Sequence, residues 1–87
     1  MGGFVRVRTV RPLDGFRLHL EFTDGSAGVV DLATHLWGPV YESVRTDRRV
    51  FEGVGVDQEL GTIVWPGGAD LDPDFLYALA HPAPARS

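Results

Sequence analysis

The sequence predicts an α+β domain with the element order β-β-β-α-β-β-α. Residues 4–11 and 16–22 alternate apolar and polar side chains with the period of two that is typical of half-buried strands. A third strand-like run follows at residues 27–31, so an antiparallel meander is expected. Residues 71–79 carry the strongest helix start signal in the chain. A sheet covered on its inner face by short helical segments is therefore the expected architecture.

The first two strands are predicted to form a hairpin around Pro12-Leu13-Asp14-Gly15. An Asp-Gly pair favours a tight primed turn, because such turns need positive φ angles. The second strand should bury Phe16, Leu18, Leu20 and Phe22. The inward set expected from the first strand is Val5, Val7 and Thr9. The turn Thr23-Asp24-Gly25-Ser26 then leads to the strand at 27–31.

The middle of the chain predicts short helices and a second hairpin. Asp31 is a candidate N-cap for a helix over 32–37 that Gly38-Pro39 would end. A second helical piece should begin at Pro39 and run through Val44, and Asp47 should cap a further turn. Residues 53–57 and 62–65 then predict a hairpin with a glycine-containing turn.

The C-terminal helix has a complete start signal. Asp72 is the expected N-cap, Pro73 suits the first helical position, and Asp74 suits the positive end of the helix dipole. Leu71 can pack against Leu76 across the cap. We therefore expect one domain over residues 1–80, followed by a loose tail at 81–87 that contains two prolines.

Composition excludes several classes of protein. The chain has 87 residues, 44% of them hydrophobic, and no cysteine, which excludes disulfides, thiolate metal sites and a cysteine nucleophile. No apolar run approaches the roughly 20 residues of a membrane span, and no signal peptide is visible. The expected location is the cytoplasm, without membrane contact.

Each candidate for catalysis or metal binding has a stronger structural explanation. Asp70, Asp72 and Asp74 alternate like calcium ligands, but Phe75 and His81 stand where a calcium loop needs Gly and Glu. The histidines His19, His35 and His81 lack the close spacing of metal ligands. The serines Ser26 and Ser43 lack the Gly-x-Ser-x-Gly setting of a nucleophile. The glycines Gly53, Gly55, Gly67 and Gly68 lack the residues that would complete a phosphate-binding loop. We expect no enzyme activity, no metal and no cofactor.

Two surfaces remain as candidates for contact with a partner. All eight basic residues are arginines, and seven precede residue 50 in a chain of net charge −4. Alternation places Arg6, Arg8, Arg17, His19 and Glu21 on the outer face of the sheet. The second candidate is the loop that contains Trp65, Gly67 and Asp70, although Trp65 could instead pack in the core.

The run Gly61-Thr62-Ile63-Val64-Trp65-Pro66-Gly67-Gly68-Ala69-Asp70-Leu71-Asp72-Pro73-Asp74 and the following Phe75-Leu76-Tyr77 resemble the closing motif of a bacterial family, domain-of-unknown-function family 2442. Phe22-Thr23-Asp24-Gly25, Val30-Asp31-Leu32 and the segment 51–57 resemble its earlier landmarks in the same order. The resemblance implies a small α+β domain. It also implies an antitoxin-like role beside a small neighbouring protein. No catalytic residue is carried over, and the chain ends before the helix-turn-helix of some members, so DNA binding does not carry over either.

The sequence thus predicts a non-enzymatic protein-interaction module. Its partner would be a small protein encoded nearby or a second copy in a homodimer. The alternative is a nucleic-acid-binding or regulatory domain that uses Arg6, Arg8 and Arg17, with Arg48 and Arg49 as further candidates. The interrupting Glu21, the lack of stacking aromatics and the acidic charge weigh against that alternative.

Overall fold

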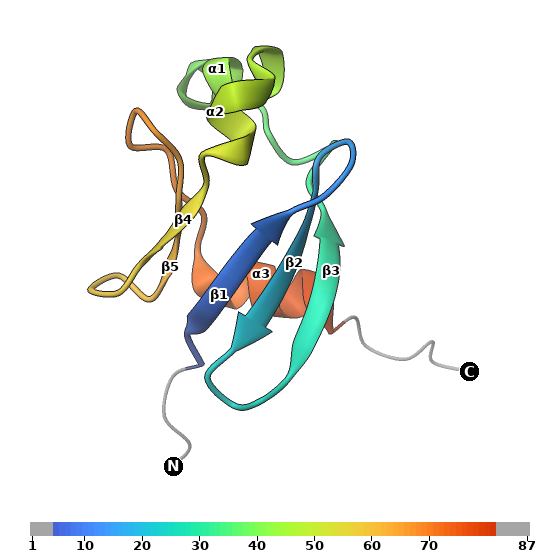
Figure 1. The fold of residues 1–87 in the computed structure, drawn as a ribbon, viewed down its shortest axis with the longest axis vertical. Coiled ribbons are helices and arrows are strands. Elements are labelled where there is room, and N and C mark those ends of the chain that lie inside the picture. The colour runs from blue at the N-terminus through green and yellow to red at the C-terminus, as the bar shows by residue number, and fades with distance from the viewer. Residues whose placement is uncertain (1–4, 82–87) are drawn as a thin grey trace.

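The computed structural model describes residues 5–81 and confirms the α+β class (Figure 1). The antiparallel meander contains β1 (Val7–Pro12), β2 (Arg17–Phe22) and β3 (Ala27–Asp31), in that order across the sheet. Phe4 and the tail beyond residue 81, for which a strand position and a loose segment were predicted, lie outside the described residues.

The turn between β1 and β2 differs from the predicted type. Within this turn only Gly15 adopts a positive φ, of 64°. Asp14 does not, since no non-glycine residue within 5–81 has a positive φ. A type I′ turn needs positive φ at both central residues, so Asp14-Gly15 does not form one. The main-chain N–H of Leu13 instead donates to the carbonyl of Arg17 at 2.8 Å.

A β-bulge at Arg8 changes which side chains β1 buries. Val7 pairs with Phe22, but the next pair is Thr9 with Glu21, so β1 has one residue more than β2 over this interval. Thr9 is therefore exposed, and the prediction that it faces the core is wrong. Val10 takes the inward position opposite Leu20 instead.

The predicted helix at 32–37 does not form. Residues 33–35 form a turn in which the Asp31 carboxylate accepts from the N–H of Ala33 at 3.0 Å. The Trp37 Nε1–H donates to the Thr34 carbonyl at 2.6 Å, and Gly38 has a φ of 90°. The Thr34 carbonyl therefore accepts from the Trp37 side chain, where a helix over 32–37 would have it accept from the main-chain N–H of Gly38. The left-handed backbone at Gly38 ends the segment.

The remaining short helices agree with the prediction. A 3₁₀ turn η1 (Pro39–Tyr41) leads into α1 (Glu42–Thr46) and α2 (Arg48–Glu52), and the Asp47 side chain caps α2 by accepting from the N–H of Arg49. In Figure 1, α1 and α2 lie beyond the end of the meander near the β1–β2 loop, rather than across its inner face as expected.

The C-terminal half supplies the second hairpin, β4 (Gly55–Asp57) with β5 (Thr62–Val64), and the helix α3 (Pro73–Ala80). The Asp72 carboxylate accepts from the N–H of Asp74 at 2.9 Å, which confirms Asp72 as the N-cap. Helix α3 crosses behind the meander (Figure 1). No helix among residues 5–81 is long and apolar enough to span a bilayer.

One core lies between the meander, α3 and the second hairpin. Its largest fully buried side chains are Trp65, Phe22, Phe51, Leu18, Leu20, Leu32, Leu36, Ile63, Leu76, Val30 and Val44. The inward set predicted for β2 is thus correct for Leu18, Leu20 and Phe22. Burial of these apolar side chains is the main stabilising contribution.

Candidate functional site

The outer face of the meander carries three of the predicted contact residues. Arg8 pairs with Glu21 at 3.4 Å, and the Arg17 Nε–H donates to the Asp14 carbonyl at 3.3 Å. His19 lies between Arg11 on β1 and Val29 on β3. Because Glu21 partly neutralises Arg8, this face is a mixed polar surface rather than a basic stripe.

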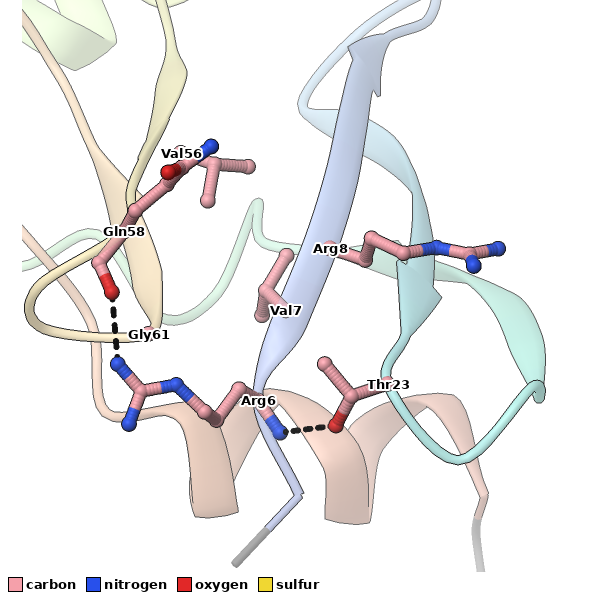
Figure 2. A pocket seen from close by; sticks show the side chains of 7 residues that line it. All are labelled: Arg6, Val7, Arg8, Thr23, Val56, Gln58 and Gly61. Carbon is pink, nitrogen blue, oxygen red and sulfur yellow. Dashed lines mark hydrogen bonds between the residues drawn. The ribbon is translucent and has the colours of Figure 1, made fainter.

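Arg6 does not belong to that face. Its Nη2 donates to the carbonyls of Gln58 and Glu59, at 2.7 and 3.0 Å, in the β4–β5 turn (Figure 2). Gly61 makes room for it: a Cβ at Gly61 would lie 2.7 Å from the Arg6 Nε, and the φ of Gly61 is 71°. The prediction that Arg6 lies on the outer face of the sheet with Arg8 is therefore wrong.

A cavity of about 200 Å³ lies between β1 and the β4–β5 hairpin. Figure 2 shows the Arg6 side chain reaching toward the hairpin while the Arg8 side chain points the opposite way, over β2. An anion bound between two guanidinium groups needs both to point at one position. Arg6 and Arg8 do not converge, so this cavity is not a built anion site.

Trp65 is a core residue. Its side chain is 2% exposed, its ring stacks on Phe51 with centroids 6.3 Å apart, and its Nε1–H donates to the Phe51 carbonyl at 3.2 Å. A partner cannot reach this indole, so Trp65 is removed from the predicted contact surface. Gly67, with a φ of 98°, and Asp70 remain exposed on the loop that follows.

The most distinctive surface lies beside Asp70, between the 34–41 segment and the start of α3. It is an open cavity of about 580 Å³, which we call the acidic aromatic groove. Its lining residues are Thr34, His35, Trp37, Tyr41, Asp70, Leu71, Asp72 and Phe75. Of these, only Asp70 was predicted as a contact residue. The sequence pattern places His35 and Trp37 in the predicted helix at 32–37 and Phe75 in the C-terminal helix, and it does not reveal the exposure of Trp37.

Trp37 is 69% exposed, although it stands on a braced segment. The preceding Leu36 is 1% exposed, and its carbonyl accepts from the Arg45 Nη1 at 2.6 Å. The bond from Trp37 Nε1 to the Thr34 carbonyl fixes the indole from the other side. A large aromatic ring held in place and left in solvent is typical of an interface anchor.

The opposite wall of the groove is formed by α3 and the loop before it. Phe75 is 36% exposed and meets His35 edge to face, with ring centroids 5.1 Å apart. The Tyr41 hydroxyl donates to the Asp70 carbonyl at 2.7 Å. Burial, and then the negative charge of Asp70, raise the pKa of Tyr41, so the phenol stays protonated at neutral pH.

The two groove carboxylates differ in their bonding. Asp72 uses one oxygen to cap α3, whereas the Asp70 carboxylate makes no hydrogen bond or ion pair within residues 5–81. A second hollow, of about 280 Å³, lies on the other side of the Asp70–Asp72 stretch and is lined in part by Leu60, which is 54% exposed. The carboxylates of Asp70 and Asp72 therefore line both the acidic aromatic groove and the hollow beside Leu60.

Within the described part of the chain, no three His, Asp or Glu side chains are grouped to hold a metal ion. His19 lies on the sheet face, His35 packs on Phe75, and His81 stacks on Tyr77 with centroids 4.1 Å apart. Ser26 donates to Asp24 at 2.6 Å. The arrangement thus offers shape, aromatic faces and negative charge, which are the means of non-covalent recognition.

Comparison with known proteins gives one family. No curated protein and no solved structure matches the chain. The model of the family described as "Protein of unknown function (DUF2442)" matches residues 7–82, which include all the strands and helices and every residue of the groove. The chain is therefore a member of the DUF2442 family.

Proposed function

We propose that this chain is a non-enzymatic protein-interaction domain that binds its partner through the acidic aromatic groove. The observation that carries this proposal is the exposed, braced Trp37 beside Tyr41, Phe75 and Asp70. Aromatic side chains contribute most of the binding energy at many interfaces when a partner covers them. A cytoplasmic location and the absence of a cofactor are part of this proposal.

The partner that we propose is a small protein encoded by a neighbouring gene, in an antitoxin-like arrangement. Support for a protein partner comes from the type of surface, since an open groove with an aromatic anchor suits a protein segment. The antitoxin-like arrangement is the expectation that the resemblance implies. A homodimer formed through the same groove is the competing arrangement. The homodimer predicts that the purified chain alone is a dimer, whereas the complex with a neighbouring protein predicts that it is not.

Co-expression with the product of the adjacent gene tests this function. We expect the two proteins to elute together from size exclusion at micromolar concentration, and we expect Trp37→Ala to weaken the complex about thirtyfold or more. Val29→Ala is the matched control, because Val29 is 48% exposed on the opposite candidate surface, the sheet face. Separate elution of the wild-type proteins, or loss of the complex only with Val29→Ala, would contradict the proposal.

The nucleic-acid alternative has less support. Arg6 donates to carbonyls of the β4–β5 turn, and Arg48 donates to the carbonyls of Gly15 and Leu13 in the β1–β2 loop. Both arginines are therefore tied to the protein itself. Phosphate binding would show a steep loss of affinity with salt. Binding to short DNA or RNA that has this salt dependence and is lost in Arg8→Ala would favour the alternative.

A further inference from the structure

We propose that the acidic aromatic groove receives an arginine side chain from the partner protein. This inference rests on the interaction function proposed above and specifies the chemistry of the ligand. It commits to a guanidinium group carried on a protein segment, rather than to a lysine or a small free cation.

Charge is the first argument. Among residues 5–81, the groove is lined by two carboxylates, Asp70 and Asp72, and by no arginine. The chain contains no lysine. Arg45 on α1 donates to the carbonyls of Leu36 and Gly38, so its charge is engaged by the protein itself. Within residues 5–81, the Asp70 carboxylate has no counter-ion. A cation from outside would supply the missing partner.

The aromatic walls are the second argument. Trp37, Tyr41 and Phe75 line the same cavity as Asp70. A cation over an aromatic face is attracted by the ring, most strongly for tryptophan. The Trp37 Nε1–H already donates to Thr34, so what the indole offers a ligand is its face. A guanidinium group is planar and can stack on a ring while its N–H groups point at a carboxylate, which a lysine ammonium cannot do in the same way.

The shape of the surface argues for a chain segment over a free small molecule. The Asp70–Asp72 stretch lines both the groove and the hollow beside Leu60, so the two hollows adjoin. An extended segment could place its arginine in the groove and an apolar neighbour on Leu60. The open form of the groove encloses too little of a small ligand to hold it tightly, because tight small-molecule sites bury most of the ligand surface.

The test uses three blocked pentapeptides: acetyl-Ala-Leu-Arg-Leu-Ala-amide and its counterparts with citrulline or lysine in place of arginine. Citrulline has nearly the same shape as arginine without the charge. Binding is followed by the amide and indole NMR signals of the intact chain. Trp37 and Trp65 are its only tryptophans, and Trp65 is buried, so the Trp65 indole is an internal control. We expect the Trp37 indole signal to shift saturably with the arginine peptide, with a dissociation constant in the millimolar range.

Four comparisons decide the proposal: two changes of the peptide and two substitutions in the chain. Citrulline in place of arginine should weaken binding roughly tenfold, and lysine should weaken it by a smaller factor. Asp70→Asn should weaken the arginine peptide without moving the Trp65 indole signal, because the Asp70 main-chain carbonyl that Tyr41 uses is retained. Glu21→Gln on the sheet face is the matched charge control and should leave binding unchanged. Equal shifts with the arginine and citrulline peptides, or no Trp37 shift at 20 mM peptide, would overturn the inference.

The outcomes separate this inference from the proposed function. If Trp37→Ala breaks a complex with the neighbouring protein but the peptides bind equally, the interaction function stands and the arginine inference fails. If the arginine peptide binds selectively but no complex forms, the groove chemistry stands and the proposed partner is wrong. Weakening of the arginine peptide at higher salt would add support, since exposed charges are screened.

Discussion

Gly28 allows α3 to lie against the meander. It pairs with Leu20 on the inner face of β3, and a Cβ added there would lie 3.0 Å from both the Cβ and the carbonyl oxygen of Ala80. Ala80 is the last residue of α3, so the C-terminal end of the helix packs directly against Gly28. A side chain at position 28 would push the helix from the sheet, and repacking of a dense core is unfavourable.

We therefore expect Gly28→Ala to lower the free energy of unfolding by about 1–2 kcal/mol through overpacking. Gly55→Ala is the matched control. Gly55 also lies in a strand, has no positive φ and has no atom within 4 Å of the position of an added Cβ, so we expect a change within about 0.5 kcal/mol. Urea unfolding of both variants measures this. Equal destabilisation would show that the approach of Ala80 is not limiting.

At the scale of elements, arginines connect segments that are distant in the sequence. Arg6 ties β1 to the β4–β5 turn, and Arg48 ties α2 to the β1–β2 loop while its guanidinium lies 4.7 Å from the Phe51 ring centroid. The guanidinium group of each arginine donates hydrogen bonds to main-chain carbonyls of a turn or loop. Such hydrogen bonds are stronger than neutral ones. These arginines therefore stabilise the arrangement of the elements.

We expect Arg48→Gln to lower the free energy of unfolding by about 1–2 kcal/mol, because its hydrogen bonds to the Leu13 and Gly15 carbonyls and its ion pair with Glu52 are lost. Arg49→Gln changes the same charge on the same helix, yet the Arg49 side chain is 93% exposed and only approaches Asp47 at 3.8 Å. The expected change for Arg49→Gln is within about 0.5 kcal/mol. Thermal unfolding of the two variants checks this, and similar losses in both would indicate a helix-wide charge effect instead.

The elements that were predicted correctly are those whose sequence signals lie close together in the chain. The strands and α3 were predictable because alternation, turn residues and the Asp72 cap lie within a few residues of one another. The helix at 32–37 failed because the Trp37 indole takes the Thr34 carbonyl. The inward position of Val10 was missed because the bulge at Arg8 breaks the period of two. The Trp37 hydrogen bond leaves no mark in apolar periodicity, whereas the bulge leaves one, since two polar residues separate Val7 from Val10.

The candidate site was only partly predictable for a related reason. Asp70 was identified because it lies in the glycine-containing loop after Trp65, and Asp72 because its cap motif is local. Trp37 and Phe75 come together in the groove from segments far apart in the sequence, and a lone tryptophan gives no sign of whether it is buried. Trp65 and Trp37 were alike in the pattern, yet one is in the core and the other is exposed.

At the scale of the whole molecule, Asp24 links the β2–β3 turn to α3. Its carboxylate accepts from the Ser26 hydroxyl and the Tyr77 hydroxyl, each at 2.6 Å, and from the Ser26 N–H at 2.9 Å. These hydrogen bonds, that of the Ser26 side chain first, lower the pKa of Asp24 from 3.8 to about 2. The hydrogen bond that the Tyr77 hydroxyl donates to Asp24 raises the pKa of Tyr77.

Since the folded state lowers the pKa of Asp24, the carboxylate contributes stability above about pH 4 that is lost as the pH falls from 3.8 toward 2. We expect Asp24→Asn to remove part of the acid dependence of the unfolding free energy between pH 5 and pH 2. Tyr77→Phe should reduce it by a smaller amount. Urea unfolding across that pH range measures the slopes, and a slope in Asp24→Asn equal to that of the wild type would contradict the prediction.

The bulge at Arg8 also bears on changes in chain length. Because Val7 pairs with Phe22 and Thr9 with Glu21, Arg8 is the one residue of β1 without a counterpart on β2. A deletion of Arg8 or of Thr9 would remove the bulge and keep the inside-outside alternation on both sides of it, whereas a deletion of Val10 or Arg11 would turn part of the strand over. Positions 8 and 9 are thus where β1 can lose a residue without reversing the strand.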